Sequence, residues 1–168
     1  MKMLEAFKKD IKKYEKVSVG FSPPGHWYHT GNFALNKIIS GTFSRGIPER
    51  RITVLAGESG AGKSFLAGNL VKNAQADGAF IVYLDSENAV DKSFLSKIGA
   101  DCSEEKLLYL QVVTIDDVTS IMSDFFNHYN KEYGVDNINA PKVVIVLDSI
   151  DMLLTEKENE DFERDDLS

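Results

Sequence analysis

The sequence lacks several features that would mark a secreted or membrane protein. It contains one cysteine among 168 residues, Cys102, so no internal disulfide can form, which weakly favours a reducing compartment. No run approaches about 18 apolar residues, and the N-terminus lacks the basic, apolar and small-residue order of a signal peptide. These absences predict a cytoplasmic protein with no membrane partner.

Basic charge is also scarce. The 26 acidic residues outnumber the 19 lysines and arginines, and the formal net charge is −7. This balance argues against a broad basic face for nucleic acid, although a local one is not excluded. The charge is uneven, because the first sixteen residues hold six lysines whereas residues 156–166 hold seven acids. The two ends of the chain therefore carry opposite signs.

Short apolar runs alternate with amphipathic stretches from Arg51 onward. Helical spacing predicts helices over 63–76, roughly 92–98 and 115–133, the last with Thr114 as its N-cap. Unbroken β-branched runs predict strands covered on both faces. These runs are RITVLAG (51–57), AFIVYLD (79–85), LLYLQVV (107–113) and KVVIVLD (142–148). The alternation predicts an α/β fold with a mostly parallel sheet flanked by helices.

Two segments flank this core. Residues 2–17 carry apolar side chains at helical spacing among lysines, which predicts an amphipathic helix, either docked on its own domain or serving as an oligomerisation arm. Pro23, Pro24 and Gly25 mark a linker after it. The predicted parts are an N-terminal helix and linker over 1–29, a core over 30–154 and an acidic, solvated tail over 155–168.

The stretch LAGESGAGKSFLAGNL, residues 55–70, carries the strongest functional signal. Residues 57–64, here called the phosphate loop, fit the P-loop or Walker A pattern GxxxxGK[ST], between a predicted strand and a predicted helix. Inward-pointing N–H groups and the helix N-terminus can hold a polyanionic phosphate chain there. The expected nucleotide-binding residues are Gly57, Glu58, Ser59, Gly60, Ala61, Gly62, Lys63, Ser64 and Phe65.

The phosphate loop also predicts a magnesium site. Lys63 would reach the β- and γ-phosphates, and the Ser64 hydroxyl would be a magnesium ligand. Such a site needs a carboxylate at the end of a buried strand, the Walker B position. Asp148 follows five apolar residues and emerges at the carboxyl edge of the sheet. Asp151 competes for this role but lies past the strand.

Hydrolysis needs a further group that orients a water molecule on the γ-phosphate. Asp85 and Glu87 end another apolar strand at the same sheet edge. Either acid could serve, and from the chemistry alone Glu87 is no better than an even choice.

These residues together resemble the RecA family of recombinases, particularly the phage recombinases of the UvsX type. The likeness covers roughly residues 30–154, and a D-S-E strand end is a narrower signal than the glycine-rich loop, which many ATPases share. Four segments carry it: TGNFALNKIISG with RGIPERRITVLAGESGAGKS, YLDSENAVDKSFLSKIGAD, LLYLQVVTIDDV and VVIVLDSIDML. The resemblance implies a RecA-like P-loop NTPase core and a DNA-dependent ATPase that acts in DNA strand exchange, recombination and repair.

The resemblance also implies ATP and Mg²⁺ as cofactors and assigns roles by position. Glu87 matches the catalytic glutamate that activates the attacking water. Asp91 and Phe94 match the acid and the ring that contact adenine, where phenylalanine replaces a common tyrosine and loses its hydroxyl. Lys63 keeps its phosphate contact, and the resemblance also implies a catalytic role for it. Ser64 and Asp148 keep their roles at the magnesium site.

Implied partners are single-stranded DNA, and a further copy or a full-length recombinase bound through the N-terminal arm. After Leu154 the sequence departs from the family pattern. The DNA-contacting loops, the glutamine that senses the γ-phosphate and one strand are missing. In the family that strand lies between the P-loop strand and the Asp148 strand, so we expect a core incomplete on its C-terminal side, with a gap that exposes backbone groups. A complementing C-terminal half could fill it.

Three interpretations stay open. The first is the ATP-hydrolysing portion of a recombinase. The second is a short, non-hydrolysing module that binds ATP and regulates or caps a recombinase filament. The third is another motor on the same fold, such as a replicative helicase or a clock-type ATPase, against which the D-S-E strand end and the adenine positions argue.

Overall fold

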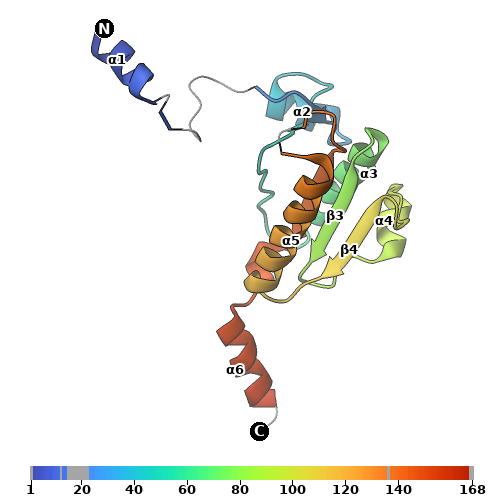
Figure 1. Ribbon diagram of the computed structural model, residues 1–168. Helices are drawn as coiled ribbons and strands as arrows, with labels where there is room; N and C mark the ends of the chain where they lie inside the picture. The colour runs from blue at the N-terminus through green and yellow to red at the C-terminus, as the bar shows by residue number, and fades with distance from the viewer. Residues whose placement is uncertain (1, 12, 15–22, 136, 167–168) are drawn as a thin grey trace.

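The computed structural model describes residues 2–11, 13–14, 23–135 and 137–166, with the side chains of the last helix described as far as Phe162. Figure 1 shows the elements in order. They are α1 (Lys2–Ile11), β1 (Trp27–Tyr28), α2 (Phe33–Ser40), β2 (Ile47–Pro48), α3 (Lys63–Ala76), β3 (Phe80–Asp85), α4 (Lys92–Ile98), β4 (Leu107–Gln111), α5 (Ile115–Tyr133), β5 (Val143–Asp148), the 3₁₀ helix η1 (Ile150–Met152) and α6 (Glu156–Asp166).

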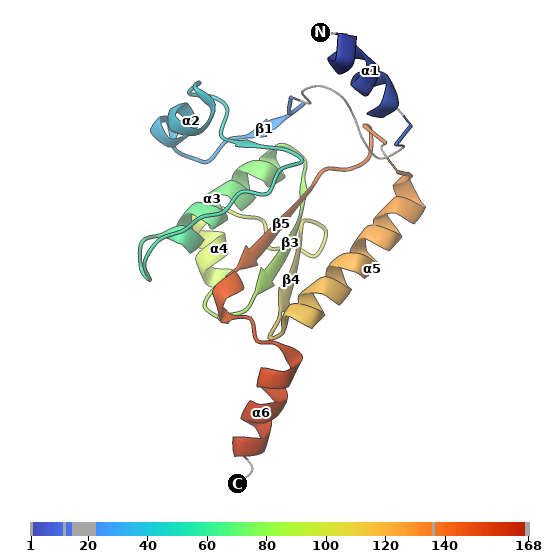
Figure 2. The same cartoon turned by 90° about the vertical axis from the view of Figure 1, so that its left-hand side faces the viewer.

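A parallel sheet of three strands, in the order β4-β3-β5, forms the centre of the molecule. Helices α3 and α4 lie on one face of this sheet and α5 lies on the other (Figure 2). Parallel neighbours need crossover connections, and α4 and α5 supply them. The structure confirms the predicted α/β fold with a parallel sheet flanked by helices.

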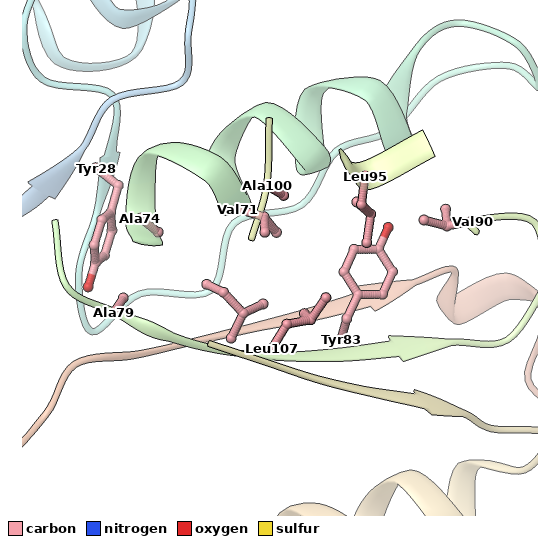
Figure 3. Packing of buried hydrophobic residues seen from close by; sticks show 10 residues of the cluster. Tyr28, Val71, Ala74, Ala79, Tyr83, Val90, Leu95, Ala100 and Leu107 are labelled. Atoms are coloured by element: carbon pink, nitrogen blue, oxygen red, sulfur yellow. The ribbon is translucent and has the colours of Figure 1, made fainter. Parts of the chain in front are cut away.

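The two faces of β3 build two apolar clusters. Ile81 and Tyr83 belong to the cluster that contains Val71 and Leu95. Figure 3 shows Tyr83 pointing from the sheet toward the α3 and α4 side. The even-numbered residues of β3 point to the α5 side, as the two-residue period of a strand requires. There Val82 and Leu84 meet Val118, Ile121, Met122 and Phe125. Central β3 is therefore covered on both faces, as its unbroken apolar run predicted.

The helix boundaries agree closely with the sequence pattern. The three predicted core helices are α3, α4 and α5, at the predicted residues. Thr114 caps α5 as expected, since its hydroxyl oxygen accepts a hydrogen bond from Asp117 N–H at 3.0 Å. None of the helices that the described part of the chain contains is both long and apolar enough to cross a membrane.

The prediction of a strand over residues 51–57 is wrong. This segment runs past α3 without joining the sheet (Figure 2), and Ile52 and Val54 are 96% and 77% exposed. Within the described residues, β5 pairs with β3 alone, so the segment has no strand beside it to bind its N–H and C=O groups. A β-branched run without a partner stays unpaired, and β5 is left as a half-buried edge strand.

Two α-helices were missed, along with the short strands β1 and β2 and the 3₁₀ helix η1. Helix α2 is capped by the Asn32 side chain, which accepts a hydrogen bond from Leu35 N–H at 3.0 Å. Most of the predicted acidic tail forms helix α6. Thr155 and Glu158 form a capping box at the start of this helix. Both caps were visible in the sequence, as an asparagine before an apolar stretch and as a T-x-x-E pattern.

The N-terminal amphipathic helix forms, but only over Lys2–Ile11, and the predicted residues 15–17 lie outside the described ranges. No residue of α1 is buried. Its apolar side chains Met3, Leu4 and Phe7 are exposed rather than packed on the core. The interpretation as an oligomerisation arm stays a prediction.

Two isoleucine variants test the corrected strand assignment. We expect Ile81→Ala to lower the free energy of unfolding by about 3 kcal/mol, because its side chain is fully buried and truncation leaves a cavity. Ile52→Ala should change it by less than about 0.5 kcal/mol, because its side chain is almost fully exposed. Urea denaturation followed by circular dichroism measures both. A comparable loss for Ile52→Ala would mean that residues 51–57 form a packed strand.

Candidate functional site

The carboxyl edge of the sheet brings the predicted acids together. Asp85 and Asp148 end β3 and β5 and are direct partners in the parallel register. Glu87 lies two residues beyond β3, and its Oε1 accepts a hydrogen bond from Ser149 Oγ at 2.7 Å. The Ser149 N–H donates to Ser86 Oγ at 2.9 Å. Side chains and backbone groups therefore tie the ends of the two strands to each other.

The structure separates the two acids at the end of β3. Asp85 is 1% exposed, and its oxygens accept hydrogen bonds from the N–H groups of Glu87, at 2.9 Å, and Val90, at 3.1 Å. It also accepts a hydrogen bond from the Tyr109 hydroxyl. Asp85 thus holds the turn that carries Glu87. Glu87 itself is exposed, and its predicted role in orienting a water molecule stays a prediction.

Asp148 is held by a tyrosine from the neighbouring strand. The buried Tyr83 hydroxyl donates a hydrogen bond to Asp148 Oδ2 at 2.9 Å. Burial, and then the negative charge of Asp148, raises the pKa of Tyr83 far above its ordinary value. Burial and the hydrogen bond to Asp85 likewise raise the pKa of Tyr109. Both phenols therefore stay protonated and act as hydrogen-bond donors at any physiological pH.

The phosphate loop makes the turns that its glycines predict. Gly60 and Gly62 have φ angles of 77° and 92°, in the left-handed region that side chains with a Cβ rarely adopt. Lys63 begins α3, and its ammonium group donates hydrogen bonds to Gly57 O at 3.0 Å and Glu58 O at 3.2 Å. The cation therefore folds back over the loop that would hold the phosphates.

The phosphate loop and the sheet edge lie within electrostatic reach of each other. A hydrogen bond from Ser149 lowers the pKa of Asp151, and the positive charge of Lys63 acts in the same direction. Asp151, which the sequence offered as a second candidate metal ligand, is exposed in η1. Because Ser149 also contacts Glu87, the lysine of the loop and the acid at the end of β3 border the same region.

The two residues expected to contact adenine both have local roles at the start of α4. The Asp91 side chain caps this helix by accepting a hydrogen bond from Phe94 N–H at 2.6 Å. The Phe94 ring is partly buried against the cluster beneath α3 and α4. These contacts place both residues next to the turn that carries Glu87, and the adenine contact stays a prediction.

The available donors fit magnesium. Within the described ranges, no group of three or more histidine, cysteine or acidic side chains could hold a metal ion by itself. Mg²⁺ typically takes one or two protein oxygens and completes its shell with water and substrate phosphates. The Ser64 hydroxyl and the Asp148 carboxylate supply oxygen donors of this kind, so the site suits an ion that arrives with a nucleotide.

Comparison with known proteins identifies the family. A family model of the RecA N-terminal domain matches residues 24–165. The chain belongs to the RecA family. The Protein RecA of Aquifex aeolicus is 37% identical over 91 residues, covering 54% of this chain and 24% of that protein. The Protein RecA of Chlamydia abortus is 30% identical over 120 residues, covering 56% and 34%.

This RecA-family chain spans roughly a quarter to a third of the length of the curated relatives named above. Its narrower likeness to phage recombinases of the UvsX type stays a prediction.

Sequence reasoning missed three residues of the site: Tyr83, Tyr109 and Ser149. The two tyrosines lie inside apolar runs that were interpreted as packing alone. A buried tyrosine hydroxyl nearly always finds a hydrogen-bond partner, so a tyrosine just before a strand-end acid was a usable signal. No comparable signal distinguishes Ser149, because its contact with Glu87 depends on how two strands align.

Two Asp→Asn variants test the role of Asp85. We expect Asp85→Asn to lower the free energy of unfolding by about 2–3 kcal/mol, because an amide nitrogen cannot accept and a buried donor loses its acceptor. Asp91→Asn removes the same charge but retains an N-cap, so its change should stay within about 0.5 kcal/mol. Urea denaturation gives both values. Equal losses would mean that charge removal, not the buried contacts, is responsible.

Proposed function

We propose that this chain is the ATP-binding and ATP-hydrolysing core of a RecA-type recombinase that acts in DNA strand exchange, recombination and repair. One observation carries the proposal. The end of β3 and the end of β5 are joined by the hydrogen bond from Ser149 to Glu87, and the phosphate loop lies within electrostatic reach of the same edge. Membership of the RecA family supports this assignment. Within the family, the proposal places the chain with the phage recombinases of the UvsX type.

The proposed reaction is phosphoryl transfer from ATP to water. Lys63 leaves the carbonyls of Gly57 and Glu58 and, with the N–H groups of the phosphate loop, stabilises charge on the β- and γ-phosphates. Magnesium, when bound, neutralises further charge on the phosphate oxygens. Ser64 and, indirectly, Asp148 hold it. Glu87, fixed by Ser149, orients the attacking water.

The proposed partners follow from the exposed surfaces and from the family. Single-stranded DNA is the expected nucleic-acid partner, and the chain would act in the cytoplasm, that of a bacterial host if a phage encodes it. The exposed apolar residues of α1 suit an arm that packs on another copy or on a full-length recombinase. The unpaired edge of β5 and the exposed segment 51–57 suit a complementing C-terminal half that supplies a strand.

A second function is favoured by one observation. Residues 51–62 are all exposed, so the strand that should hold the phosphate loop against the sheet is not formed. A chain of this kind could bind ATP without turnover and regulate or cap a recombinase filament. A third candidate, a helicase-type motor on the same fold, is disfavoured by the match to the RecA N-terminal domain.

The first variant tests nucleotide binding. We expect Lys63→Ala to weaken binding of a fluorescent ATP analogue at least about tenfold, because charge-assisted contacts to phosphate are lost. Lys72→Ala is the matched control, since Lys72 lies on the same helix but faces Gly99. Fluorescence titration of the purified chain gives both affinities. Unchanged binding in Lys63→Ala would contradict the role of the phosphate loop.

The second variant tests hydrolysis. Glu87→Gln should keep ATP binding and lose at least about a hundredfold in turnover, because the carboxylate that activates water is gone. ATP hydrolysis is measured with and without single-stranded DNA, which should raise the wild-type rate. Glu104→Gln, an exposed residue before β4 at the other end of the sheet, serves as the control. A wild-type rate in Glu87→Gln refutes the catalytic assignment, whereas wild-type binding without turnover favours the regulatory module.

A further inference from the structure

Two stacked tyrosines lie beneath the acids at the carboxyl edge of the sheet. Tyr83 and Tyr109 are partners in the register of β3 and β4, and their ring centroids are 5.8 Å apart with 25° between the planes. Each hydroxyl serves a different acid. Tyr83 donates to Asp148 Oδ2 at 2.9 Å, and Tyr109 donates to Asp85 Oδ2.

Tyr83 is held in place by its surroundings. It is fully buried, and its backbone is paired on both sides, with Tyr109 and with Val146. Figure 3 shows its ring standing between the sheet and α4, beside Leu95. A ring held in this way cannot swing its hydroxyl into solvent, so the hydrogen bond restricts rotation of the Asp148 carboxylate.

Packing alone does not account for the hydroxyl. The ring belongs to the apolar cluster beneath α3 and α4, and a phenylalanine would fill the same space. Burying a hydroxyl costs free energy unless it is hydrogen-bonded, and here the partner is the predicted metal carboxylate. Tyr83 donates to Oδ2, and the carboxylate keeps further acceptor sites for a metal-bound water.

We propose that Tyr83 is a positioning residue for the magnesium site, whose hydroxyl orients Asp148 toward the water shell of the ion that accompanies ATP. The proposal rests on the proposed function, because it requires that Asp148 serve magnesium. Groups that hydrogen-bond a ligating carboxylate set its orientation and tune metal affinity. Tyr83 acts through Asp148 and does not touch the nucleotide.

The test is Tyr83→Phe, which removes the hydroxyl and keeps the ring. Binding of a fluorescent ATP analogue to the full chain is measured over a range of Mg²⁺ concentrations and in EDTA. We expect the Mg²⁺ concentration for half-maximal binding to rise about tenfold, the lower end for loss of such a contact, since Asp148 acts through water. Binding in EDTA should be unchanged. Mn²⁺ titration followed by electron paramagnetic resonance, with ADP present, measures metal affinity directly.

Tyr109→Phe is the matched control. It removes a hydroxyl from the same stacked pair, but the partners of that hydroxyl are Asp85 and the Val90 carbonyl, not Asp148, so the magnesium dependence should not shift. In an Asp148→Asn background, Tyr83→Phe should have no further effect on magnesium dependence, because the carboxylate that it orients is absent.

Several results would overturn the proposal. They are an unchanged magnesium dependence in a folded Tyr83→Phe chain, an equal shift in Tyr109→Phe, and a shift that persists beside Asp148→Asn. A Tyr83→Phe chain that fails to fold would assign the hydroxyl to stability instead. A wild-type chain that binds no nucleotide overturns the proposed function and this inference together, whereas magnesium-dependent wild-type binding with an unaffected Tyr83→Phe overturns the inference alone.

Discussion

The parallel register between β3 and β5 is the constraint on which the rest of the site depends. It sets Asp85 beside Asp148, brings Tyr83 within 2.9 Å of the Asp148 carboxylate and lets Ser149 reach Glu87. A shift by one residue would turn the side chains of one strand to the opposite face and separate these pairs. The register is in turn fixed by the apolar clusters on both faces of β3, because only one alignment buries both sets of residues. The packing of the apolar core thus fixes the strand register, and the register fixes the positions of the carboxylates.

The other half of the site is anchored differently. Lys63 and Ser64 stand in the first turn of α3, which is held to the sheet by Val71 and Ala74. The residues before them, 51–62, pair with no strand, and the outer edge of β5 is unpaired among the described elements. Fixing the backbone of one residue costs about 1–2 kcal/mol, so a paired strand before the loop would lower the free energy that phosphate contacts must supply in the proposed function.

Local patterns were predictable and long-range pairings were not. The core helices and the strands β3, β4 and β5 follow from periodicity that each segment carries within itself. The run at 51–57 has the same β-branched character, yet a strand exists only where a neighbour binds its backbone, which its own residues cannot reveal. The site divides in the same way. The phosphate loop, Glu87 and Asp148 were predicted because each ends or begins a local pattern. Tyr83 and Ser149 became visible only when two strands were aligned.

Nucleotide binding and hydrolysis make different demands on this chain. In the proposed function, the phosphate contacts come from residues 57–65, a contiguous stretch whose shape depends on glycine turns and on one helix, so binding requires little of the remaining fold. The proposed hydrolysis requires more, because a water molecule would have to be held between Glu87, on the turn after β3, and a phosphate bound by another segment. That distance is set by how firmly the phosphate loop is pressed against the sheet. A strand paired with both β5 and residues 51–57 would fix this spacing through backbone hydrogen bonds. Adding a strand at the edge of β5 would therefore change the rate of ATP hydrolysis more than the affinity for ATP. Only hydrolysis requires a fixed distance between the phosphate loop and Glu87.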